Sequence, residues 1–148
     1  EKILVPTDFS ENSIYALGYA KYLAKSFGAR LYILHVIHEL LGITNFYVPH
    51  ISVEKIEGDM IKVAEDMMEK LCRENLPELN DYETAVVIGL PPQEIIKIAE
   101  EKEIDMIVMG THGRSGLEKA IFGNTAEKVV KKAPCPVLTV RQPEREAL

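Results

Sequence analysis

The sequence predicts a doubly wound α/β domain, in which a parallel sheet carries helices on both faces. Short apolar runs alternate with amphipathic segments along the whole 148-residue chain. The apolar runs are hydrophobic throughout rather than at every second position, which is typical of strands buried on both faces. Alternating strands and helices favour a parallel sheet, because each helix returns the chain to the same starting edge. Since the chain has no internal repeat and no linker, we expect one domain over residues 1–141 and a polar tail over residues 142–148.

The predicted elements follow from apolar runs, helical spacing and end signals. Ser10 is the expected N-cap of the first helix, and Gly28 is its expected C-terminal stop. Proline is tolerated in a first helical turn, so Pro91 and Pro92 open a short helix. Five strands are predicted at residues 3–5, 31–36, 84–88, 106–109 and 137–140. The other helices are predicted at residues 10–27, 53–71 and 126–132. The positions expected to face inward are Ala16, Ala20, Leu23, Ala24 and Phe27 in the first helix, and Ile56, Met60, Val63, Ala64, Met67 and Leu71 in the second.

One long connection, residues 37–50 (IHELLGITNFYVPH), has no clear period and is rich in large apolar side chains. Loops at strand ends commonly carry specificity. The segment therefore either covers a site at the end of the second strand or is buried against a partner, and the sequence does not decide between these.

Composition narrows the class of protein. The net charge of −6 includes no basic stripe, so we expect no nucleic-acid partner. No apolar run approaches the roughly 18 residues of a membrane span, so we expect no membrane association. Cys72 and Cys135 lie far apart and follow no secretory leader, which favours a reduced, cytoplasmic protein. Cys135 precedes an apolar strand, and we expect it to be a buried thiol rather than a reactive one.

The fourth predicted strand ends in a glycine-rich stretch that holds Gly110, Gly113 and Gly116 and continues to Gly123. Glycine lets bare backbone N–H groups approach a ligand, and the start of a helix offers further N–H groups at the positive end of its dipole. Strand, glycine loop and helix start together form the arrangement that binds phosphate.

The better-known nucleotide motifs are absent. The chain has no G-x-x-x-x-G-K-[ST], and no glycine follows the first strand where a dinucleotide fingerprint would need one. Asp8 alone does not indicate a phosphoacceptor receiver domain, because that site needs a second acid beside it and a lysine after the last strand. The chain offers Thr7 and Thr139-Val140 at those places.

The run GTHGRSGLEKAIFGNTAEKVVKKAPCPVLTVR closely resembles the universal stress protein family, in its ATP-binding branch. The opening ILVPTDFSENSIYAL and the LHV of the second strand resemble it as well, so the resemblance extends from Lys2 to Arg141. It implies a Rossmann-like fold of the adenine nucleotide alpha hydrolase type, with sheet order 3-2-1-4-5. In this order Asp8 and Gly110 would face each other across one crevice.

The resemblance also implies a site for ATP, which we expect to bind with Mg²⁺ because the protein is acidic. Asp8 would lie near the ribose, since an ionised carboxylate only accepts hydrogen bonds, and Arg114 would hold phosphate oxygens. The adenine would be flanked by Pro6, Thr7 and Val36. The ribose would contact Met109 and Gly110, and the phosphates would contact Gly113, Arg114, Gly123, Asn124 and Thr125.

One residue departs from the family pattern, which usually has Ser or Thr after the last loop glycine, where this chain has Asn124. Its amide can still donate to a phosphate oxygen, so we expect the site to persist with altered affinity. Asn124 cannot accept a phosphate, which puts in doubt at this position the self-phosphorylation reported for some family members.

Three functions remain open. We expect an ATP-binding regulatory protein with a stress-response role, in which no residue is assigned to catalysis. One alternative is a nucleotide-free interaction module that forms homodimers through the edge strand Val137 to Val140. The other is a slow ATPase or phosphotransferase, for which the loop offers Arg114 and Lys119.

Some of these residues also have structural interpretations. Asn124 and Glu127 could form a capping box for the last helix, alone or together with a phosphate contact. Asp8 could cap the first helix in competition with Ser10. The chain's four histidines, His35, His38, His50 and His112, do not form a metal-ligand pattern, so we expect no metal site made from side chains.

Overall fold

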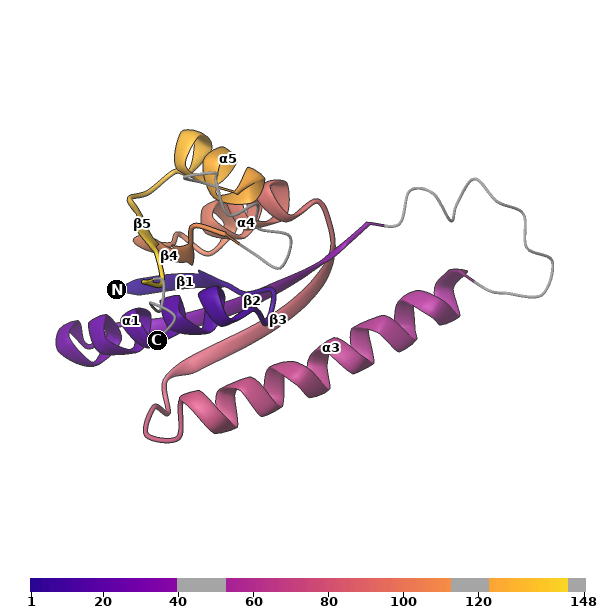
Figure 1. Cartoon of the computed structure of the whole chain (residues 1–148), viewed down its shortest axis with the longest axis horizontal. Coiled ribbons are helices and arrows are strands. Elements are labelled where there is room, and N and C mark those ends of the chain that lie inside the picture. Colours follow the sequence, from indigo (N-terminus) through magenta and orange to yellow (C-terminus); the bar gives the residue numbers. More distant parts are fainter. Residues whose placement is uncertain (40–52, 113–122, 144–148) are drawn as a thin grey trace, which may run out of the picture.

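The computed structural model describes residues 1–39, 53–112 and 123–143 and confirms the doubly wound α/β fold (Figure 1). The strands are β1 (Lys2–Pro6), β2 (Arg30–His38), β3 (Tyr82–Gly89), β4 (Met106–Gly110) and β5 (Val137–Val140). The helices are α1 (Glu11–Phe27), α3 (Val53–Asn75), α4 (Pro91–Glu101) and α5 (Asn124–Lys132). All strand pairs are parallel, in the order β3-β2-β1-β4-β5. None of the described helices is both long and apolar enough to cross a bilayer.

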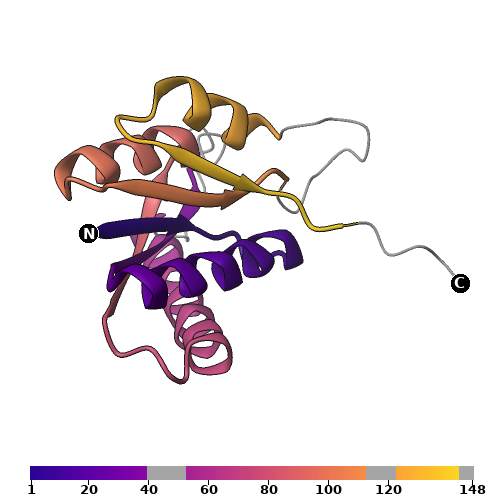
Figure 2. The ribbon, with the colours of Figure 1, turned by 90° about the vertical axis from the view of Figure 1, so that its left-hand side faces the viewer.

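The sheet lies between two helical layers, with α1 and α3 on one face and α4 and α5 on the other (Figure 2). Alternate residues of β1 supply both layers, because Ile3 and Val5 pack under α1 while Leu4 packs under α4 and α5. The strands at the centre of the sheet are therefore buried on both faces, as their unbroken apolar runs predict.

The ends of α1 agree with the sequence. Ser10 is its N-cap, and its side chain accepts a hydrogen bond from the backbone N–H of Ser13 at 3.3 Å. Gly28 ends the helix in the left-handed conformation, with φ of 65°. That backbone region favours glycine, which explains why the helix stops there.

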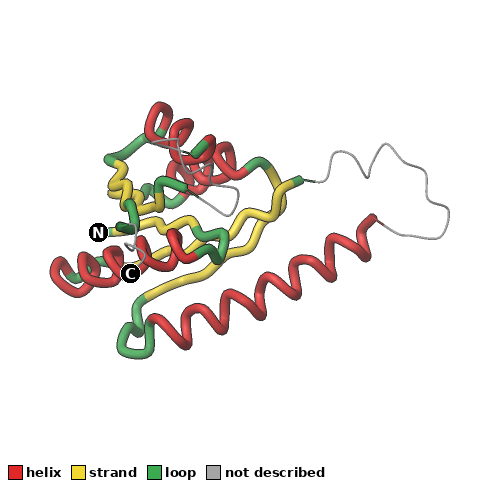
Figure 3. The backbone as a smooth tube through the Cα atoms, viewed as in Figure 1, coloured by secondary structure: helices red, strands yellow, loops and turns green. Residues whose placement is uncertain are grey.

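The predicted inward faces are wrong at three positions. Phe27 is 67% exposed, Val63 is 59% exposed and Met67 is also exposed. Phe27 is the last residue of α1. In α3 the buried residues are Ala64, Met68, Leu71 and Cys72, so its packed face is rotated from the predicted one and covers only the second half of the helix. The first turns of α3 extend past the end of β2 (Figure 3), beyond the described strands of the sheet.

Strand β3 also departs from expectation, because it is an edge strand and only partly covered. Glu83, Thr84 and Ala85 are exposed, and its buried positions are limited to its far end. Both β2 and β3 are longer than predicted, since eight consecutive residue pairs join them from Leu31–Tyr82 to His38–Gly89.

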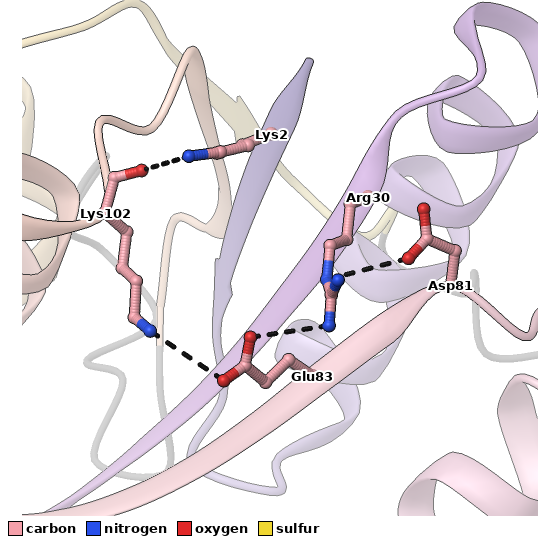
Figure 4. Close-up of polar contacts among 5 residues, drawn as sticks. All are labelled: Lys2, Arg30, Asp81, Glu83 and Lys102. Carbon is pink, nitrogen blue, oxygen red and sulfur yellow. Dashed lines mark hydrogen bonds and ion pairs between the residues drawn. The ribbon is translucent and has the colours of Figure 1, made fainter.

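Ion pairs and one hydrogen bond join the amino ends of β3, β2 and β1 to the end of α4 (Figure 4). Glu83 pairs with Arg30 at 3.5 Å and with Lys102 at 3.8 Å, and Arg30 also pairs with Asp81 at 3.6 Å. Lys2 donates from its Nζ to the carbonyl oxygen of Lys102 at 3.0 Å. This network lies at the amino edge of the sheet, opposite the edge where a ligand would bind.

Candidate functional site

The winding of the chain reverses between β1 and β4, whose carboxyl ends lie side by side in the sheet. Ligands of open α/β sheets bind at such a reversal. The first turn of α1 packs directly on the end of β4, because a methyl group built on Gly110 would lie 3.2 Å from the carbonyl oxygen of Asn12. The segment after β1 and the segment after β4 therefore meet at one place.

The turn from β1 to α1 is fixed by hydrogen bonds within itself. Thr7 donates its backbone N–H to the carbonyl oxygen of Leu34 at 2.8 Å, which continues the pairing of β1 with β2. The Thr7 hydroxyl is 2.8 Å from the hydroxyl of Ser13 and accepts from the N–H of Phe9 at 3.0 Å. These contacts hold the ends of the turn close to the start of α1.

Asp8 lies in the middle of this turn, and its Oδ1 accepts a hydrogen bond from the N–H of Ser10 at 3.0 Å. A side chain that bonds two residues ahead forms a local turn of the backbone. The helix cap itself is Ser10, so the interpretation of Asp8 as the cap of the first helix is wrong. Asp8 as a residue is half-buried, and it follows the carboxyl end of β1.

Sequence reasoning missed two residues that support this turn, His35 and Phe9. The ring of His35 donates from Nδ1 to the carbonyl oxygen of Thr7 at 2.7 Å and packs on the ring of Phe9, with ring centroids 4.5 Å apart. Phe9 has φ of 65°, which is rare for a bulky residue. The LHV of the second strand places His35 at the right strand end, but its partner is a backbone carbonyl, which no side-chain pattern can show.

His35 and His38 have separate backbone partners. His38 is exposed, and its Nδ1 contacts the carbonyl oxygen of Glu39 at 3.2 Å. Within the described ranges, no three His, Cys, Asp or Glu side chains come together as metal ligands would.

The two predicted apolar contacts, Val36 and Met109, belong to the layer of α4 and α5. Met109 is buried in that core, and Val36 is half-buried against it. Val36 lies beyond the last β1–β2 pair, which joins Pro6 to Leu34. Because the Met109 side chain packs inward, its backbone is the part that remains for a ligand.

The start of α5 is tied to the end of β4. Gly123 donates its N–H to the carbonyl oxygen of Thr111 at 2.6 Å, and Thr111 itself donates to the carbonyl oxygen of Val140 at 3.2 Å. Thr111 is buried, and its hydroxyl lies 3.0 Å from Nδ1 of His112. The first N–H groups of α5 are therefore brought to the carboxyl end of β4, beside the turn that contains Asp8.

The prediction of a capping box formed by Asn124 and Glu127 is wrong. Gly123 occupies the cap position, and the N–H of Glu127 bonds to the Gly123 carbonyl oxygen at 3.0 Å. Asn124 is already the first residue of the helix and is exposed, so its side chain does not bond back to the helix start in the way a cap does. Glu127 instead pairs with Lys131 at 3.0 Å. A glycine cap leaves the early N–H groups of α5 without a side-chain acceptor from the cap residue.

The remaining predicted site residues are placed as follows. Thr125 is half-buried in the first turn of α5, and Pro6 is half-buried at the end of β1. Gly113 and Arg114 lie outside the described residues, as does most of the apolar segment 37–50.

Comparisons with known proteins agree with this arrangement. The Universal stress protein family matches the chain over residues 1–141. Two universal stress proteins of Methanocaldococcus jannaschii are similar to it. MJ0531 is 34% identical over 99% of this chain and 85% of its own length, and MJ0577 is 36% identical over 96% and 95%.

Solved structures share the fold along the whole chain. The structure of MJ0577 superposes with a TM-score of 0.84 at 32% identity, covering 98% of both chains. The universal stress protein UspA of Lactobacillus plantarum superposes with a TM-score of 0.78 at 26% identity, covering 95% of this chain and 97% of that one. The chain belongs to the universal stress protein family.

Proposed function

We propose that this protein binds an adenine nucleotide, ATP with Mg²⁺, at the carboxyl ends of β1 and β4 and acts as a regulatory protein of the stress response. The observation that carries the proposal is the meeting of two segments at the reversal of the sheet. The first turn of α1, which directly follows the turn that contains Asp8, packs on Gly110, and the start of α5 is joined to Thr111. An acceptor for ribose hydroxyls and donors for phosphate thus come from two sides of one place.

The two sides suit different parts of the nucleotide. A carboxylate accepts from ribose hydroxyls and repels phosphate, so Asp8 with Pro6, Thr7 and Val36 is assigned to the adenosine half. The N-terminus of α5 attracts anions, so Gly123, Asn124 and Thr125 are assigned to the phosphates, together with Gly113 and Arg114. Met109 and Gly110 lie between the two groups along β4 and are assigned to the ribose. Asn124 donates from its amide where a hydroxyl is usual in the family.

The fold supports this assignment in a general way. Structures of the same fold have been solved for a universal stress protein in complex with cAMP and for a universal stress protein of Archaeoglobus fulgidus in complex with dAMP. They superpose on this chain with TM-scores of 0.61 and 0.65 at 21% and 22% identity. An adenine nucleotide therefore fits this architecture.

The proposed site binds the nucleotide without hydrolysing it efficiently. Hydrolysis needs a base or a positioned water near the last phosphate. The nearest described carboxylate on α5, Glu127, is engaged by Lys131 one turn further along the helix. We expect hydrolysis to be slow or to depend on a partner. Both cysteines are free thiols, which suits a reducing compartment such as the cytoplasm.

Titration calorimetry with Mg-ATP and with AMP tests the proposal. A few charge-assisted hydrogen bonds of about 1.5–3 kcal/mol each are enough for micromolar affinity. ATP should bind more tightly than AMP. The substitution Asn124→Ala should weaken the binding of ATP more than the binding of AMP. Absence of binding for both nucleotides below millimolar concentration would refute the proposal. Release of ADP faster than about one per minute, lost on Gly113→Val, would favour the ATPase alternative.

A second proposal concerns strand β5, which is at the edge of the sheet among the described strands and pairs there with β4. Its Leu138 is 38% exposed, and an exposed apolar edge strand is a template for pairing with another strand. We propose that two copies form a homodimer along Val137 to Val140. Leu138→Glu should give monomers in analytical ultracentrifugation, while Val63→Glu, on the distant helix α3, should leave the dimer intact. Dimers that persist in Leu138→Glu would exclude this edge.

A further inference from the structure

His35 contacts both ends of the turn that holds Asp8. Its Nδ1 lies 2.7 Å from the carbonyl oxygen of Thr7, just before Asp8, and its ring packs on Phe9, just after it. A carbonyl oxygen only accepts, so Nδ1 must carry the proton. Asp8 is thus held between two residues that share a single supporting side chain.

The turn needs such support because its backbone is strained. Phe9 adopts φ of 65°, a left-handed backbone conformation that residues other than glycine rarely take. Strained residues persist only where surrounding contacts determine them, and they gather at ligand sites. Three contacts determine this one. The N–H of Phe9 bonds to the Thr7 hydroxyl, that hydroxyl meets Ser13, and the Phe9 ring packs on His35 with an interplanar angle of 41°.

His35 comes from a different strand than the one that leads into the turn it supports. It belongs to β2, on the same face as Ile33 and α1, and it lies 28 positions away from Thr7 in sequence. Its neighbour Val36 faces the opposite layer. The second strand therefore contributes to the site twice, with Val36 on one face and His35 on the other.

We propose that His35 is a positioning residue of the nucleotide site, which holds the turn from Thr7 to Phe9 in the conformation that presents Asp8 to the adenosine half. This inference rests on the proposed nucleotide function. It assigns His35 no contact with the ligand, and it predicts that its effect is the same for nucleotides that differ only in their phosphates.

Two substitutions separate the two contacts of His35. His35→Phe keeps an aromatic ring for Phe9 but removes the donor. His35→Asn keeps an N–H at the same number of bonds from the backbone as Nδ1 but removes the ring. His38→Phe is the matched control, because His38 is exposed three residues further along and its ring contacts the carbonyl oxygen of its own neighbour Glu39 rather than the turn that holds Asp8.

The readouts are the affinities of each folded variant for AMP and for Mg-ATP by calorimetry, with thermal unfolding of the nucleotide-free protein measured alongside. Loss of one neutral hydrogen bond in His35→Phe should weaken the binding of both nucleotides by about three- to tenfold. His35→Asn should recover most of the affinity, and His38→Phe should bind as the wild type does. Hydrogen exchange at Phe9 and Ser10 should be faster in His35→Phe without nucleotide.

Unchanged affinity in His35→Phe would overturn the positioning role, as would a loss confined to ATP or an equal loss in His35→Asn. A merely structural residue would lower the unfolding temperature and leave the affinity of the folded protein unchanged. If His35→Phe does not fold, His35→Gln moves the N–H one bond further out and gives the same comparison with His35→Asn. A wild-type protein that binds neither nucleotide would refute the proposed function and this inference together, whereas the outcomes above refute the inference alone.

Discussion

The backbone N–H of Gly123 donates to the carbonyl oxygen of Thr111 at 2.6 Å, which joins the start of α5 to the end of β4. The contact is close enough that a side chain interferes with it, since a methyl group on Gly123 would lie 3.2 Å from the same oxygen. Two backbone segments approach closely here, so any side chain at this position would crowd the Thr111 carbonyl oxygen. The position of the α5 N-terminus relative to the sheet depends on this contact.

Gly123→Ala should therefore weaken nucleotide binding while α5 remains folded. The neighbouring backbone must shift by a few tenths of an ångström, which misaligns the N–H groups offered to phosphate. Loss of part of one charge-assisted hydrogen bond corresponds to about tenfold weaker ATP binding and a smaller effect on AMP. Calorimetry measures both, and equal affinities in the variant and the wild type would contradict the role given to this contact.

Two other glycines provide matched controls, because alanine at these positions should raise the stability of the protein and leave nucleotide binding unchanged. Gly18 in α1 and Gly58 in α3 are exposed in helix interiors, and nothing lies within 4 Å of a methyl group added to either. Alanine restricts the unfolded chain and favours the helix, so each Gly→Ala change should raise the free energy of unfolding by about 0.5–1 kcal/mol. Urea unfolding measures the gain. The two gains should add, and nucleotide affinity should not change.

Glu103 offers a stabilising substitution at the end of α4. It has φ of 52°, and its N–H bonds to Glu100 while the N–H of Ile104 bonds to Ala99, which is the hydrogen-bond pattern of a glycine-ended helix. Relief of left-handed strain outweighs the added freedom of the unfolded chain, so Glu103→Gly should stabilise by about 0.5–1 kcal/mol.

The same change two residues earlier, Glu101→Gly, should destabilise the protein by up to about 1 kcal/mol, because Glu101 is the last residue within the helix. Urea unfolding of both variants compares the two positions directly. A loss of stability in Glu103→Gly would show that its side chain contributes more than its backbone costs.

The ion pairs at the amino edge should matter only at low salt. Glu83 lies between two cations, Arg30 and Lys102, which also flank the ring of Tyr32 at 5.6 and 5.7 Å from its centroid. All three charged side chains are close to half exposed, so each pair contributes little in water. Glu83→Gln should lower the free energy of unfolding by about 0.5–1 kcal/mol at low salt, because the two cations then repel each other.

In 1 M salt the Debye length falls to about 3 Å and this difference should disappear. Glu74→Gln is the control, since Glu74 forms a single exposed pair with Lys70 at 4.0 Å one turn away in α3. Glu74→Gln should change the free energy of unfolding by no more than about a few tenths of a kcal/mol, at low salt as well as at high salt. A Glu83→Gln effect that persists in 1 M salt would indicate packing rather than charge.

The fold was predictable because its signals are local. Unbroken apolar runs mark the central strands, and end signals such as Ser10 and Gly28 mark α1 correctly. The packed face of α3 was not predictable, because its apolar stripe is wider than the surface it covers. The sequence cannot tell that Met68 packs inward while Met67 and Val63 remain exposed. That choice depends on how the helix lies over the edge strand β3 and its neighbour β2.

The candidate site was predictable only in its outline. Once the sheet order is known, the ends of β1 and β4 place the segment that holds Asp8 and the segment that follows Gly110 at the same edge of the sheet. The role of His35 depends on a backbone carbonyl 28 positions away and on the left-handed conformation of Phe9, neither of which leaves a mark in the sequence. The cap of α5 was wrong by one residue, because Asn124 is a good cap residue by type while the contact with Thr111 places Gly123 there.

The buried thiol of Cys72 should make stability fall at alkaline pH. Burial among α1, α3 and the sheet raises its pKa from 9.0 to about 11. Between these values the unfolded chain loses the thiol proton while the folded protein keeps it, so the folded state binds more protons. Stability is then fully present below pH 9 and decreases as the pH rises toward 11. Cys135 adds to this in the same direction, since burial, and then the charge of Asp105, raise its pKa as well.

Comparison with Cys72→Ala isolates this contribution. The variant should be less stable at neutral pH because it leaves a small cavity, but its free energy of unfolding should fall less steeply from pH 9 to pH 11. Urea unfolding at several pH values measures both slopes, and labelling with a disulfide reagent provides a second readout. In the native protein at pH 8 the half-buried Cys135 should react first and Cys72 only as fast as the protein opens. Identical pH slopes for the variant and the wild type would show that the Cys72 thiol ionises as readily in the folded protein as in the unfolded chain.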